Sequence, residues 1–266
     1  MRSRILAIFE TTLALLLMAA VFRLVRPVGQ GSSPYRFLEY ALMLVLTLGG
    51  LLLSRRDMAA FGVSFRNVKG NFSIFAAAFF PLLAVSAVLS QVDWSIWGGA
   101  LLVSSLALAM LFLLAWLLKK SPSPGQMGGM AAGLALAPWM FVPEPGSKVS
   151  QALLSVVYFY FFVAPAEEIF FRGYIQSRLN QVFGRPYLFS GVSWGWGWII
   201  ASLLFGLWHV IWNPFALAGW LHGLWTFFVG LLFGYVREKS GSVMAPAWLH
   251  GVLNYSPVAF ILDLFV

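Results

Sequence analysis

The chain has 266 residues, 61% of them hydrophobic and 10% charged, and its mean hydropathy is +0.85. A soluble domain holds about 45–50% apolar and about 25% charged residues, so this composition excludes that class and indicates a polytopic membrane protein. The formal net charge of +8 does not predict a nucleic-acid partner, because lysine and arginine occur in short clusters between apolar runs, as in membrane-protein loops. The absence of cysteine excludes disulfides and thiolate metal sites.

The predicted fold is all-α, a bundle of eight or nine transmembrane helices. Apolar runs close to the roughly 20 residues that a bilayer requires recur along the whole chain. The run at 127–143 is short and rich in glycine and proline, so it is either one of nine spans or a re-entrant segment. In chain order, the predicted spans are residues 5–24, 37–53, 71–91, 97–118, 127–143, 150–171, 194–213, 216–236 and 243–264.

The charges between these spans indicate an orientation. With nine spans and the N-terminus in the cytoplasm, most of the 17 lysine and arginine residues fall on the cytoplasmic side, including those of segments 172–192 and 237–242. Cytoplasmic loops carry an excess of positive residues, so this orientation is the favoured one. We therefore expect an integral protein of a prokaryotic plasma membrane, in contact with the lipid bilayer, with a cytoplasmic N-terminus. The positive residues left on the outer side are Arg23, Arg26, Arg36 and Lys148.

Loops rich in proline and glycine at 121–126 and 143–147 divide the chain. The N-terminal accessory helices, residues 1–126, contain nothing diagnostic of a function. The predicted core, residues 127–266, holds all three histidines and a pair of adjacent acids. We predict that this core carries the functional site.

The adjacent acids, Glu167 and Glu168, end an apolar run in the stretch APAEEIFFRGYIQ, residues 164–176. An ionisable residue within such a run is costly and therefore indicates a functional site. Glu168 and Arg172 stand at i and i+4 with the acid first, which is the favourable order for an intrahelical ion pair. This pairing leaves Glu167 to point into the protein. The alternative is that both acids lie at the membrane interface and extend towards water.

All three histidines, His209, His222 and His250, lie in predicted spans. A histidine in a membrane helix commonly makes an interhelical hydrogen bond, and we expect this structural role for His222, near the outer end of its helix. The other two have aromatic or polar neighbours four residues away, because His209 follows Phe205 and His250 precedes Asn254. Residues at i and i+4 share a helix face, so each pair can act on one site.

Depth in the membrane singles out ionisable residues on three different helices. Counted at about 1.5 Å per residue from the predicted cytoplasmic ends, Glu167, His250 and His209 lie roughly 8, 12 and 17 Å deep. We therefore expect these residues to converge with Asn254 on one water-accessible cavity. A carboxylate there can take a proton from water, and imidazole and carboxamide groups can stabilise an oxyanion. This combination suits hydrolysis of an amide bond.

Three short stretches carry a resemblance to a known family. EEIFFR (167–172), FGLWH (205–209) and HGVLN (250–254) are similar, in order and rough spacing, to the motifs EExxxR, FxxxH and HxxxN of the CPBP intramembrane proteases. This family comprises the CAAX-processing and bacteriocin-self-immunity, or Abi, proteins. The resemblance covers about residues 150–257. It implies an endopeptidase that cleaves a membrane-associated or lipidated protein or peptide near the cytoplasmic face.

The same resemblance implies a role for each motif residue. Glu167 and His209 would activate the attacking water, and His250 and Asn254 would form the oxyanion site. The supporting residues would be Glu168, Arg172 and Phe205.

We expect a site without metal, in which Glu167 is the base. Zinc is the alternative cofactor, because Glu167, His209 and His250 could supply the three protein ligands usual in a catalytic zinc site. Two features favour the metal-free version. Asn254 is a poor zinc ligand but a good oxyanion donor. Glu168, the carboxylate that could support a ligating histidine, is already matched to a basic partner.

Two other functions are compatible with these residues. A non-catalytic immunity or scaffold protein could bind a peptide or partner through the same polar groups. A proton-coupled transporter could use Glu167, His209 and His250 as a relay, although the chain shows no inverted repeat of the kind that many transporters contain.

Overall fold

The computed structural model describes residues 2–26, 36–64, 67–89, 92–93, 95–119, 148–257 and 260. The predicted span at 127–143 lies outside the described residues. The loops 121–126 and 143–147 lie outside them as well, so the division into residues 1–126 and 127–266 stays a prediction.

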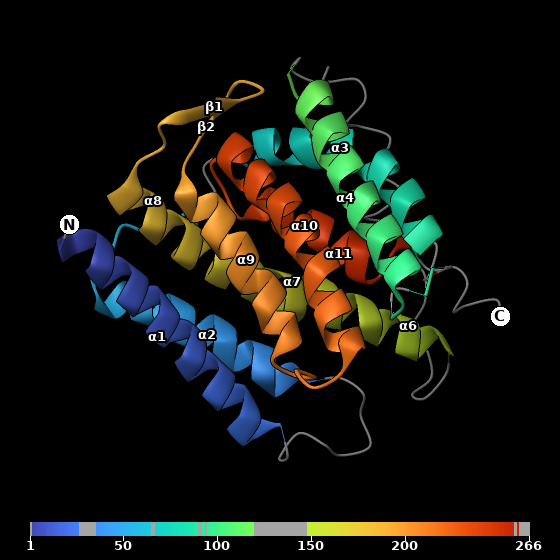
Figure 1. The fold of residues 1–266 in the computed structure, drawn as a ribbon, viewed down its shortest axis with the longest axis horizontal. Coiled ribbons are helices and arrows are strands. Elements are labelled where there is room, and N and C mark those ends of the chain that lie inside the picture. The colour runs from blue at the N-terminus through green and yellow to red at the C-terminus, as the bar shows by residue number, and fades with distance from the viewer. Residues whose placement is uncertain are drawn as a thin grey trace.

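Within the described residues the protein is a bundle of helices, as the sequence predicts (Figure 1). One helical segment of 36 residues, Lys148–Phe183, crosses behind the central pair of helices, and in it α-helical turns alternate with wider π-helical turns. The elements are α1 (Arg2–Val25), α2 (Phe37–Leu53), α3 (Val68–Leu89), α4 (Trp97–Leu117), α6 (Lys148–Val156), η2 (Val157–Val163), α7 (Ala164–Glu168), η3 (Ile169–Gln176), α8 (Ser177–Phe183), β1 (Tyr187–Phe189), β2 (Val192–Trp194), α9 (Trp196–Val210), α10 (Leu217–Ser240) and α11 (Met244–Asn254).

Four helical segments in the described part are long and apolar enough to cross a membrane. Two further apolar helices, α2 and α9, are shorter. These segments confirm an all-α membrane protein, whereas the number of spans, eight or nine, stays a prediction. The four segments are Ser3–Val25, Trp97–Leu117, Lys148–Phe183 and Leu217–Ser240.

The last predicted span, residues 243–264, is wrong as one continuous helix. Helix α11 ends at Asn254, and Tyr255 has extended backbone, with φ −146° and ψ 93°. Pro257 explains this end, because proline lacks an N–H and disfavours helical backbone at the residue before it. The Tyr160 hydroxyl donates a hydrogen bond of 3.1 Å to the Tyr255 carbonyl and so ties this end to η2.

A short β-hairpin that the sequence analysis did not predict follows α8. Strands β1 and β2 pair antiparallel, with Tyr187 opposite Trp194. Ser190 and Gly191 form the two-residue turn, and both have positive φ, 47° and 78°, as hairpin turns of this length require. The Ser190 hydroxyl donates to the Ala115 carbonyl over 2.7 Å, which fixes the hairpin to the end of α4.

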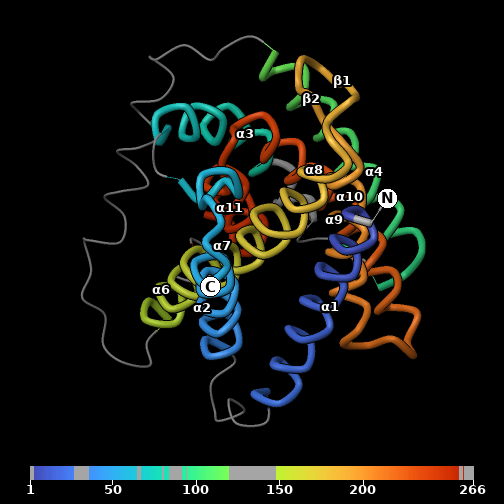
Figure 2. Tube along the Cα trace, turned by 90° about the vertical axis from the view of Figure 1, so that its left-hand side faces the viewer, coloured from blue at the N-terminus to red at the C-terminus, as the bar shows by residue number. Residues whose placement is uncertain are grey.

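Helices α9 and α10 lie side by side at the centre of the bundle (Figures 1 and 2). Their close approach depends on glycine, because a Cβ added to Gly206 would lie 2.6 Å from the carbonyl oxygen of Gly223. Small residues at such interfaces allow the tight packing on which association of membrane helices depends. Helices α1 and α2 lie on one side of this pair, and α3 and α4 lie on the other.

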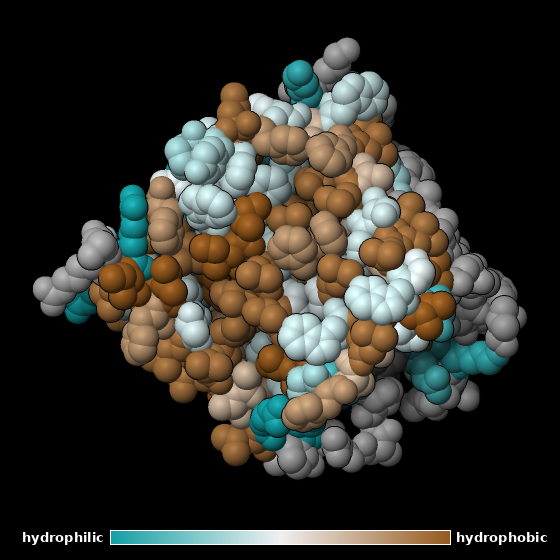
Figure 3. Space-filling model, in the orientation of Figure 1, coloured by the Kyte–Doolittle hydropathy of each residue, from teal (hydrophilic) through white to brown (hydrophobic). Residues whose placement is uncertain are grey.

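Apolar side chains cover much of the face shown in Figure 3. Large exposed examples on the outer helices include Phe9 at 62%, Leu16 at 61% and Trp116 at 70% exposure. A soluble monomer rarely exposes contiguous apolar surface of this kind. This surface is therefore suited to contact with lipid.

Candidate active site

The two adjacent acids lie in α7, a short α-helical turn between the π-helical stretches η2 and η3. Helical backbone continues through Pro165 to Phe183. Turns of the π type are rare and are frequently found at functional sites. Glu167 and Glu168 are buried, at 3% and 0% exposure, which excludes the alternative of two acids at the membrane interface.

Glu168 connects the three sequence motifs. Its Oε1 accepts a hydrogen bond of 3.0 Å from Arg172 Nη1, which confirms the predicted ion pair. The same oxygen accepts a hydrogen bond of 2.9 Å from Nδ1 of His250, a contact that the spacing did not predict. The Arg172 guanidinium lies over the Phe205 ring, 4.2 Å from its centroid. Because Glu168 and Arg172 are fully buried, each charge depends on the other for compensation.

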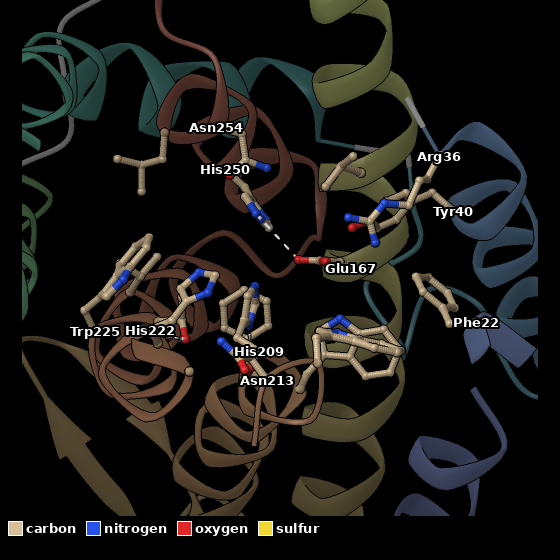
Figure 4. A pocket seen from close by; sticks show the side chains of 18 of the residues that line it. Phe22, Arg36, Tyr40, Glu167, His209, Asn213, His222, Trp225, His250 and Asn254 are labelled. Carbon is tan, nitrogen blue, oxygen red and sulfur yellow. Dashed lines mark hydrogen bonds and ion pairs between the residues drawn. The ribbon is translucent and has the colours of Figure 1, made fainter. Parts of the chain in front are cut away.

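Glu167 lies next to His250 instead of its expected partner, His209. Its Oε2 is 3.7 Å from Nε2 of His250, the contact drawn as a dashed line in Figure 4. Trp208 lines the same cavity as this carboxylate. Among the described residues, the ion pairs within 4.0 Å include none between Glu167 and His209. The two residues therefore share a cavity without direct contact.

His209 is held by its own helix and by a neighbouring one. Its Nδ1 lies 2.8 Å from the Phe205 carbonyl oxygen, so Nδ1 carries the donated hydrogen. The Phe205 ring packs against the imidazole with 4.7 Å between ring centroids, and the His222 ring of α10 packs at 4.8 Å. Phe205 also lies 5.9 Å from the His250 ring. Phe205, which was expected to be a supporting residue, therefore lies next to both motif histidines.

A cavity of about 430 Å³ brings the four predicted catalytic residues together. Glu167, His209, His250 and Asn254 all line it, and they come from α7, α9 and α11. Figure 4 shows their side chains around one space. The lining also includes residues that the sequence analysis did not select as catalytic: Phe22, Arg26, Arg36, Tyr40, Trp208, Asn213, His222 and Trp225.

Helices α1 and α2 supply one wall of the cavity, although their sequences show nothing diagnostic. Arg36, the residue before α2, and Tyr40 of α2 lie on the side of Glu167 away from the histidines (Figure 4). Arg26 and Arg36 both pair with the buried Glu39, each at 3.6 Å. The helices predicted to be accessory therefore take part in forming the site.

His222 also lines the cavity, a position that the sequence analysis did not predict for it. On α10, His222, Trp225, Thr226 and Val229 all line the cavity, at positions i, i+3, i+4 and i+7. This one-sided spacing was the signal in the sequence that could have identified His222.

The cavity extends to the end of the bundle that carries Arg26, Arg36 and the loop between α9 and α10. The nine-span topology predicts that both arginines lie outside, whereas the resemblance implies cleavage near the cytoplasmic face, and both stay predictions. The depth estimate took Arg172 as the membrane surface. Arg172 is fully buried, and its helical segment continues to Phe183.

In the part of the chain that the structure describes, no three histidine, aspartate or glutamate side chains are already grouped to hold a metal ion. Glu167 and His250 approach each other, and His209 donates through Nδ1 to the Phe205 carbonyl, which leaves Nε2 as the nitrogen that could bind a metal. The metal-free site and the zinc alternative both stay predictions, and no step is assigned to a metal.

The segment that contains this site matches a known family. The model for the family described as "Type II CAAX prenyl endopeptidase Rce1-like" covers residues 149–256. This segment is similar to the Rce1-like family. The Rce1-like segment begins with α6, ends just after α11 and contains all three motifs. This match confirms the resemblance to CAAX proteases, whereas membership of the Abi branch stays a prediction. No curated protein and no solved structure matches the chain.

Proposed function

We propose that the protein is an intramembrane endopeptidase in which Glu167 activates water for attack on a peptide bond. The observation that carries this proposal is the convergence of Glu167, His209, His250 and Asn254 on one cavity within an Rce1-like segment. Glu167 is only 3% exposed, which suits a base in a site that excludes bulk water.

In the proposed reaction, the Glu167 carboxylate takes a proton from water while the water oxygen attacks the carbonyl carbon of the scissile bond. The proton then passes from Glu167 to the leaving amine nitrogen as the C–N bond breaks, which regenerates the carboxylate. His250 contacts Glu167 and orients it towards the cavity. His209, fixed through Nδ1, presents Nε2 to the attacking water.

The oxyanion that forms on the substrate would be stabilised by Asn254 and His250, which stand one helical turn apart on α11. A carboxamide N–H is a strong donor in a site of low polarity, and loss of one such donor lowers kcat by about 10²–10³ in a well-studied protease. Glu168 fixes the His250 ring through Nδ1. Glu168 and Arg172 thus act on the reaction through His250 and need no contact with substrate.

The substrate that we propose is a membrane-associated or lipidated protein or peptide. The family description names CAAX prenyl endopeptidases. Aromatic side chains form much of the cavity wall, and such walls bind apolar ligand groups. They are Phe22, Tyr40, Phe159, Phe205, Trp208, Trp212 and Trp225.

Comparison of membrane proteomes from cells with the wild type and with Glu167→Gln tests the proposal. Glutamine has nearly the same shape but cannot act as the base, so products truncated at C-terminal or juxtamembrane sites should disappear. Glu10→Gln is the matched control, because Glu10 accepts hydrogen bonds from Arg56, Tyr174 and Arg178 outside the cavity. Identical processing in wild-type and Glu167→Gln cells would favour a non-catalytic immunity or scaffold protein.

A further inference from the structure

We infer that His222 is a positioning residue, which holds the His209 imidazole in the orientation that hydrolysis requires. This inference rests on the proposed function of the cavity, but the contacts that support it are independent of any reaction. His222 lies on α10, between the second and third motifs, and belongs to none of them. Figure 4 shows it beside His209 in the cavity wall.

Four rings form a row along this wall. The Phe205 and His209 centroids are 4.7 Å apart, those of His209 and His222 are 4.8 Å apart, and those of His222 and Trp225 are 5.3 Å apart. The first two contacts are edge-on, and the last is stacked with 25° between the ring planes. His209 is therefore contacted by one ring from its own helix and by one from α10.

The contact with His222 of α10 restricts a tilt of the His209 ring that its hydrogen bond alone allows. The bond from Nδ1 to the Phe205 carbonyl fixes one nitrogen, but the imidazole can still tilt about this contact. The His222 ring packs against the His209 imidazole, limits this tilt and so sets the direction in which Nε2 points. Direction matters, because a misplacement of about 1 Å in an active site can cost about 10²-fold in rate.

The His222 ring is itself held in place. Its neighbour in sequence, Gly223, packs so closely on α9 that its carbonyl oxygen would lie 2.6 Å from a Cβ on Gly206. The Thr226 hydroxyl donates to the His222 carbonyl over 2.7 Å, and Trp225 stacks on the imidazole. A residue that positions a catalytic group must be fixed by its own packing, and His222 meets this condition.

Histidine NMR on the full-length protein tests the positioning directly. The chain contains three histidines, so selective labelling of the ring Cε1–H group gives three signals, which single His→Gln variants assign. In His222→Ala, the His209 signal should shift and broaden, whereas in His222→Phe it should stay close to its wild-type position. A His209 signal that His222→Ala leaves unchanged would overturn the inference.

Kinetics with a substrate from the proteome comparison provide the second test. His222→Ala should lower kcat about tenfold or more and change KM less than about twofold, because the loss affects orientation and not binding. His222→Phe keeps a ring and removes both nitrogens, so it should recover most of kcat. An equal loss of kcat in both variants would show that the nitrogens themselves act, and it would overturn the positioning role. Absence of hydrolysis by the wild type would refute the proposed function alone, since the NMR comparison still decides the positioning.

Discussion

Replacement of Glu168 by glutamine tests how far the site depends on one buried carboxylate. Glu168→Gln keeps the shape of the side chain and removes its charge. Glu168 and Arg172 are both 0% exposed, and the carboxylate also accepts the N–H of His250. Breaking a buried ion pair leaves an uncompensated charge and costs about 3–5 kcal/mol, or roughly 150- to 5,000-fold in the folding equilibrium.

The free energy of unfolding, measured by SDS titration of the purified protein in mixed micelles, should fall by this amount. The double variant Glu168→Gln/Arg172→Met removes the stranded charge as well, so it should regain most of the lost stability. Its hydrolytic activity should stay low, because Nδ1 of His250 still lacks the carboxylate that fixes the ring. A loss below about 1 kcal/mol in the single variant, or a double variant that is no more stable, would refute the reasoning.

Three further predictions concern packing, orientation and metal. Gly206→Ala should lower the free energy of unfolding by about 1–3 kcal/mol, because its Cβ would lie 2.6 Å from the Gly223 carbonyl oxygen. Gly98→Ala is the control and should not lower it, because a Cβ there would have nothing within 4 Å. Thermal unfolding measures both variants. A reporter inserted at Gly184 should be cytoplasmic and one at Phe215 external if the charge bias sets the orientation, and the reverse result would place the cavity mouth in the cytoplasm. Exhaustive chelation should leave hydrolysis unchanged, and activity that depends on added stoichiometric zinc would contradict the metal-free proposal.

Local features of the site could be predicted because helix geometry is local. The i,i+4 spacing predicted the Glu168–Arg172 pair, and apolar runs predicted α1, α2 and α4 closely. Contacts between helices carry no such signature in one sequence. The bond of His250 to Glu168 and the packing of His222 on His209 depend on how α7, α9, α10 and α11 meet.

Three features were missed, each for its own reason. The charge of Arg172 was taken to mark the membrane surface, but a charge can be buried when a partner compensates it, as Glu168 does. The cavity wall supplied by Arg36 and Tyr40 was missed because α2 resembles any apolar membrane helix until its neighbours are known. The hairpin at 187–194 was missed because strands of three residues are too short for alternation to be recognised.

Hydrolysis of a membrane-anchored peptide by the purified protein in vesicles tests the central claim most directly. A general base contributes about 10²–10⁴-fold to a rate, so cleavage should be lost in Glu167→Gln. The Glu10→Gln control should cleave at close to the wild-type rate, with all three proteins equally inserted and folded. Cleavage by Glu167→Gln within about tenfold of the wild-type rate would contradict the assignment of Glu167 as the base.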